Sequence, residues 1–242
     1  MAVSLGKFDG LYIGEEQHRE TALRIIEGNP DLRLHISITE AAMDLADVFR
    51  KIGSDDEDIK VITIFGMRTF NAFGASLKLT LSGYHQNAAL VLRDVLETAF
   101  LLDLFAGNRA LITQWRLADK PTRMKNFSPV LVRKTLDERD GNTTKKRFAI
   151  YELFSELAGH PTMKSAWMMR PDKDGDAVIG PFMEASTLTA VLSEMGRLAI
   201  QVGEHLNKFF PADIKPGLDQ RFAFAKLKLE WLNTFYLSPD AK

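Results

Sequence analysis

Apolar side chains recur at spacings of three and four along most of the chain, the period of an α-helix that buries one face. Glycine, proline and N-capping residues divide this pattern into segments. The segments are 15–27, 34–49, 62–81, 88–104, 111–117, a brief one after Ser128–Pro129, 148–157, 184–209 and 217–237. They predict an all-α fold, a multi-helix bundle of about eight or nine helices.

The pattern changes between residues 167 and 182. An Asp-Gly pair, Asp174–Gly175, lies between the short apolar runs 167–169 and 177–179. Such a pair between apolar runs is typical of a tight turn, so a small β-hairpin insertion is predicted near 167–182. The acidic residues resemble a calcium loop, but counted from Asp172 the glycine stands fourth rather than sixth, which favours the hairpin turn.

The pattern predicts one helical domain over 1–242. Acidic helices occupy 1–60, a core bundle with the hairpin occupies 61–210, and an apolar tail helix occupies 217–237. Exposure of that tail would be costly, so we expect it to dock on the bundle or on a partner.

The composition of the chain excludes several kinds of site and favours some classes of protein over others. The 242 residues include no cysteine, which excludes disulfides, thiol nucleophiles and thiolate metal sites and favours a cytoplasmic location. Residues 1–10 lack a secretory signal, and charges interrupt the most apolar stretch, 88–106, so no membrane span is expected. No cofactor-binding or nucleophile motif occurs, so neither a cofactor nor enzymatic activity is indicated.

Charge is unevenly distributed. Residues 1–60 hold seven Lys/Arg against thirteen Asp/Glu, whereas residues 109–147 hold eleven against four. Clustered cations attract phosphates, so the second segment is a candidate anion or nucleic-acid contact. A charge run is more often a solvated helix face or a partner for the acidic segment, and that interpretation is favoured. The candidate anion-binding residues are Arg116, Arg123, Arg133, Lys134, Lys145, Lys146 and Arg147.

Two charged residues interrupt the most apolar helix. Arg93 and Glu97 stand at i and i+4, so they project from one side of the helix that Tyr84 and His85 open. A structural ion pair is one interpretation, with Asp94 as an alternative partner of the arginine.

The other interpretation is a polar pocket, to which Tyr84 and His85 also belong. Arg93 would bind an anion, Glu97 would orient a base, and His160 would approach from the end of a later helix. A single Glu-x-x-His, Glu15 to His18, has no second copy, so no metal site is predicted.

Two runs carry a resemblance. The first is 83–97, GYHQNAALVLRDVLE, and the second is 151–161, YELFSELAGHP. Together they resemble a pattern of bacterial all-helical proteins that are compared with HEPN-like bundles. The resemblance implies a helical bundle that can form dimers. Active HEPN RNases carry Arg, four to six residues, then His; here Arg197 and His205 are separated by seven, so the nuclease motif is absent.

Three functional hypotheses follow. The first is a noncatalytic bundle that acts through protein contacts, as a homo-oligomer. The second is a HEPN-like protein of the defence or toxin type that contacts nucleic acid through the basic segment. The third is a small-molecule site around Arg93, Glu97 and His160.

Overall fold

The computed structural model describes residues 6–171, 175–211, 215 and 217–237. All regular structure in these residues is helical, and ten α-helices are present. They are α1 Lys7–Glu27, α2 Pro30–Ile52, α3 Glu57–Leu81, α4 His85–Gly107, α5 Ala110–Leu117, α6 Lys120–Asn126, α7 Pro129–Arg139, α8 Lys146–Phe154, α9 Ala185–Asn207 and α10 Leu218–Leu232. Three further turns are η1 Ser155–Gly159 (π), η2 Met163–Met169 (3₁₀) and η3 Asn233–Leu237 (π). The predicted all-α class is confirmed.

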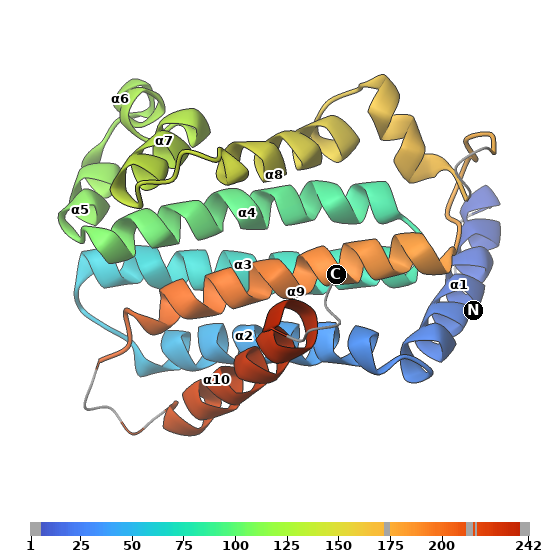
Figure 1. The fold of residues 1–242 in the computed structure, drawn as a ribbon, viewed down its shortest axis with the longest axis horizontal. Helices are drawn as coiled ribbons and strands as arrows, with labels where there is room; N and C mark the ends of the chain where they lie inside the picture. Colours follow the sequence, from blue (N-terminus) through green and yellow to red (C-terminus); the bar gives the residue numbers. More distant parts are fainter. Residues whose placement is uncertain (1–5, 172–174, 212–214, 216, 238–242) are drawn as a thin grey trace.

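Four long helices, α2, α3, α4 and α9, form the centre of the molecule (Figure 1). Each buries one apolar stripe against the others, as its three-and-four spacing requires. Leu45, Ile62, Leu92 and Leu192, one from each helix, are completely buried. Helices α7 and α8 with η1 lie on α4, and this second layer forms the sites described below.

The tail helix α10 packs on α2. Its Trp231 is buried and donates a hydrogen bond from Nε1 to Nδ1 of His35 at 2.8 Å. The ring of Phe224 lies where a side chain at Gly203 of α9 would start, 2.3 Å from an ideal Cβ. Only glycine allows this close approach.

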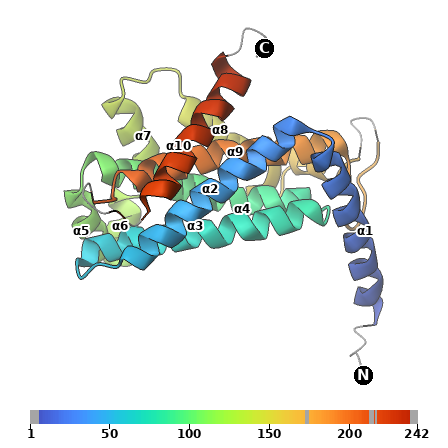
Figure 2. The ribbon, with the colours of Figure 1, turned by 90° about the horizontal axis from the view of Figure 1, so that it is seen from below.

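Helix α1 contacts one end of the bundle, and its first half projects away from it (Figure 2). The helix begins at Lys7, eight residues earlier than the pattern predicts, because the glycine-rich start hides the helical period.

The predicted β-hairpin is wrong for the described residues. Thr162 caps η2, where its Oγ1 accepts from the amide of Ser165 at 3.2 Å, and no strand follows in 175–182. Val178 donates to the carbonyl of Met169 at 2.9 Å, but this bond does not extend into a ladder. A two-stranded hairpin without a sheet to pack on is marginal, and the side chain of Ile179 is fully exposed. Residues 172–174 of the predicted turn lie outside the described residues.

Helix α6 is not among the predicted segments, which pass from 111–117 to the brief one after Ser128–Pro129. Pro121 stands in the first turn of this helix. Asp119 caps that helix and accepts from the amide of Thr122 at 2.9 Å. The preceding helix α5 already ends at Leu117, and a proline is compatible with the first turn of a new helix, so Pro121 belongs to the start of α6.

Candidate functional site

Arg93 joins α4 to the second layer. Its Nη2 donates to the hydroxyl of Tyr151 at 2.6 Å, and its Nε donates to Oγ of Ser155 at 3.1 Å. Glu97, one turn further along α4, lies 3.2 Å from the same guanidinium. The ion pair lies within α4, and Arg93 alone bridges α4 to α8 and η1.

The π-helical turn η1 makes this approach possible. Gly159, at its end, lies against Arg93, whose Cδ is 3.1 Å from the position of a Cβ at residue 159. A single π turn inside a helical segment is found often at functional sites. Sequence reasoning missed Tyr151 and Ser155, although their i, i+4 spacing places both on one helix face.

The other predicted pocket residues lie apart from Arg93 and Glu97. Tyr84 donates to Oε1 of Glu15 in α1 at 2.9 Å. His85 is buried at the start of α4, where its ring packs edge-on against Phe182 at 5.3 Å. Burial lowers the pKa of His85 to about 4, so this ring is neutral near pH 7.

His160 is exposed, and its side chain takes no part in the hydrogen bonds and the ion pair that Arg93 and Glu97 form. Arg93, Glu97 and His160 line none of the cavities discussed below. The structure therefore does not bring the predicted pocket residues together around one of those cavities.

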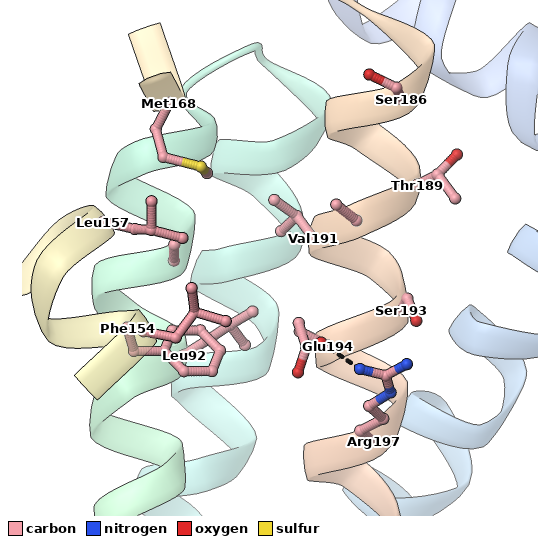
Figure 3. A pocket seen from close by; sticks show the side chains of 13 residues that line it. Leu92, Phe154, Leu157, Met168, Ser186, Thr189, Val191, Ser193, Glu194 and Arg197 are labelled. Atoms are coloured by element: carbon pink, nitrogen blue, oxygen red, sulfur yellow. Dashed lines mark hydrogen bonds and ion pairs between the residues drawn. The ribbon is translucent and has the colours of Figure 1, made fainter. Parts of the chain in front are cut away.

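An apolar groove lies beside this network (Figure 3). Leu92 of α4, with Phe154 and Leu157 from α8 and η1, lines one side, and Val191 of α9 lines the other. The groove has a volume of about 400 Å³. Because Arg93 fixes α8 and η1 through Tyr151 and Ser155, it holds the wall that Phe154 and Leu157 form.

Glu194 and Arg197 stand at one end of the groove and form an ion pair on α9 (Figure 3). Burial raises the pKa of Glu194, and Arg197 opposes that change. Both residues also line a second cavity of about 660 Å³. The groove and the polar cavity therefore adjoin at Glu194 and Arg197.

The polar cavity is built around a buried carboxylate, Asp103 of α4. Arg139 binds both of its oxygens at 3.1 Å, and Arg147 lies 3.6 Å away. Nδ1 of His205 is 3.6 Å from Oδ1. Burial lowers the pKa of His205, and the Asp103 carboxylate opposes it.

Five cationic side chains line the polar cavity against three acidic ones. The cations are Arg139, Lys146, Arg147, Arg197 and Lys208, and the acids are Asp103, Asp140 and Glu194. Hydrogen bonds from Arg139 and Arg147 lower the pKa of Asp140 to about 2. The cavity thus holds an excess of positive charge at neutral pH.

Three of the candidate anion-binding residues, one each on α5, α6 and α7, have partners within the chain. Arg116 pairs with Asp58 at 2.8 Å, and Arg123 donates to two carbonyls while its guanidinium lies over the ring of Trp115. Lys134 pairs with Glu138 at 3.7 Å.

The remaining four lie around α7 and α8. Arg147 pairs with Asp137 at 2.8 Å, whereas Lys145 and Lys146 are exposed at the start of α8. Arg133 is buried and stacks on the ring of Tyr151. Acidic neighbours therefore neutralise part of the basic segment.

No group of three or more histidine and acidic side chains that could hold a metal ion is found in the described part of the chain. None of its helices combines the length and apolar character needed to span a bilayer.

Comparison of the chain with protein-family models, with curated proteins and with solved structures found no match. The HEPN-like resemblance stays a prediction, and the functional argument depends on the geometry of the chain's own residues.

Proposed function

We propose that this chain is a ligand-binding helical protein whose groove between α4, α8–η1 and α9 takes an elongated molecule with an apolar body and one anionic end. The observation that carries the proposal is that the apolar groove and the cationic cavity lie next to each other and share Glu194 and Arg197 in their walls. Ligand sites have volumes of about 300–1,000 Å³ and combine apolar walls with a few polar groups. Both properties are found here.

The apolar body would lie between Leu92, Phe154 and Val191, where it displaces water from their side chains. The anionic end would lie near Arg197, with Arg139 and Arg147 further along the cavity. The two arginines are already held by Asp103, so their orientation is fixed before a ligand binds.

Dodecanoate, a twelve-carbon carboxylate, is a suitable probe in calorimetric titrations and thermal melts. We expect saturable binding and a rise in Tm, and at least tenfold weaker binding of dodecyltrimethylammonium, which has the same chain and a cationic end. Equal binding of the two amphiphiles would contradict the charge argument.

A matched pair of variants locates the site. Ala190→Phe places a ring in the groove from an exposed position on α9, whereas Ala225→Phe makes the same change on the exposed face of α10. The first variant should weaken dodecanoate binding at least tenfold, and the second should bind like the parent chain. If both bind like the parent chain, the groove is not the site.

Self-association is a second candidate, favoured by the projecting half of α1. Phe8, Tyr12 and Ile13 are more than half exposed there, and nothing lies within 4 Å of a Cβ at Gly10 or Gly14. Exposed apolar side chains favour a partner surface, and glycines permit close approach of a second helix.

Light scattering after size exclusion tests this candidate. If α1 joins two copies, Ile13→Ser should shift the mass toward a single chain, whereas Leu117→Ser, at an exposed leucine of α5, should not. A single-chain mass for the parent protein would refute self-association without affecting the groove.

A further inference from the structure

Arg133 is a buried cation that forms no ion pair with the described residues. The residue is 4% exposed, and its Nη1 has no hydrogen-bond acceptor in the described structure. The Cζ atom of Arg133 lies 3.7 Å from the centre of the Tyr151 ring. This cation–π contact is favourable, but it does not replace the hydrogen bonds that the guanidinium would make to water. A buried charge without a hydrogen-bonded partner is costly, so the position favours an acceptor that comes from outside the chain.

The nearby carboxylates are already engaged. Asp137, one turn along α7, binds Arg147 at 2.8 Å and accepts from Asn142 at 3.3 Å. Glu138 pairs with Lys134 at 3.7 Å. Neither forms an ion pair with Arg133 in the described structure.

Arg133 lines a cavity of about 660 Å³ between α7 and the start of α8. Lys145 lines the same cavity, in a left-handed conformation with φ of 54°. It precedes α8, whose first amides receive no side-chain cap. Uncapped amides and the helix dipole favour an anion at such an N-terminus.

We infer that this cavity binds the phosphate group of a small phosphorylated molecule, or free phosphate, through Arg133, Lys145 and the first amides of α8. The planar guanidinium can give two parallel hydrogen bonds to phosphate oxygens, and the lysine adds a second charge at the cavity edge. The cavity shares no lining residue with the apolar groove and shares Asn142 with the cationic cavity, but Arg133 and Lys145 line neither of those two sites, so the inference depends on different charged residues from the proposed function.

Titration calorimetry with inorganic phosphate, at an ionic strength held constant with chloride, tests the inference. We expect saturable binding with one site per chain. Glycerol phosphate, titrated in parallel, distinguishes the sources: equal affinity assigns binding to the phosphate group alone, and tighter binding assigns the remaining cavity to the rest of an ester. The absence of saturable binding of both overturns the inference.

Variants test the residues. Lys145→Asn removes the charge and keeps a residue that tolerates a left-handed backbone, and Arg133→Lys keeps the charge but loses the planar donor pair. Each should weaken phosphate binding about tenfold. Lys125→Gln removes an exposed charge on α6 and should bind phosphate like the parent chain.

If Arg133→Lys does not fold, the phosphate affinity of Lys145→Asn still tests whether this cavity is the binding site. Equal affinity in Lys145→Asn and Lys125→Gln would show that the cavity is not the site.

Discussion

The contact between His35 and the tail helix predicts a pH-dependent stability. His35 is 4% exposed, accepts the hydrogen bond of Trp231 at Nδ1 and stacks on Phe235 with ring centres 4.5 Å apart. Burial lowers the pKa of His35 to about 4, from an ordinary value near 6.5. Protonation would also remove the acceptor that Trp231 uses.

The sign follows from the lowered pKa. The folded chain resists protonation and the unfolded chain does not, so this stabilisation is fully present above pH 6.5 and is lost as pH falls toward 4. A difference of about 2.5 units corresponds to about 3 kcal/mol in total, of which about 2 kcal/mol is lost between pH 7.5 and pH 5.

Urea unfolding at pH 7.5 and pH 5, followed by tryptophan fluorescence, measures this loss. Because His85 and His205 also have lowered pKa values, the relevant quantity is the difference between the parent chain and His35→Gln. That difference in unfolding free energy should change by about 2 kcal/mol between the two pH values. His160→Gln, at an exposed histidine, serves as the control. If the parent chain and His35→Gln lose equal stability on acidification, the reasoning is refuted.

Three further predictions concern packing and polar contacts. Gly203→Ala places a methyl group against the ring of Phe224 and should lower the unfolding free energy by about 1–3 kcal/mol in urea unfolding. Gly74→Ala, where nothing lies within 4 Å, should instead raise it by up to about 1 kcal/mol; a loss in both would contradict the packing argument. Asp103→Asn removes the charge that holds two arginines and should cost about 1–3 kcal/mol, measured in the same assay, whereas an unchanged value would mean that water replaces the carboxylate. Arg93→Met should speed hydrogen exchange of the amides in 155–160 more than that of α2, and uniform protection would show that the bridge does not hold η1.

The helical period predicts the long helices because they bury continuous apolar stripes. It predicts α2, α3, α4 and α9 well and fails where local chemistry is ambiguous. Pro121 stands in the first turn of a helix, α6, that the pattern does not predict, and an Asp-Gly pair needs a neighbouring sheet before a hairpin forms.

Part of the polar site was also predictable. The i, i+4 spacing places Arg93 beside Glu97. Their partners Tyr151 and Ser155 come from a segment about sixty residues away, and their approach depends on a π turn that has no period of its own in the sequence. The burial of Arg133 likewise depends on how α7 packs, which composition does not reveal.

The wide turn at Ser155–Gly159 has a consequence for insertions and deletions. Each residue of an α-helix advances the side chains by about 100° around the axis. Shortening this turn by a single residue would let the ordinary hydrogen-bond ladder close, but it would rotate everything that follows by about a quarter turn. Chain length across these five positions is therefore constrained, in addition to the side chains at Ser155 and Gly159.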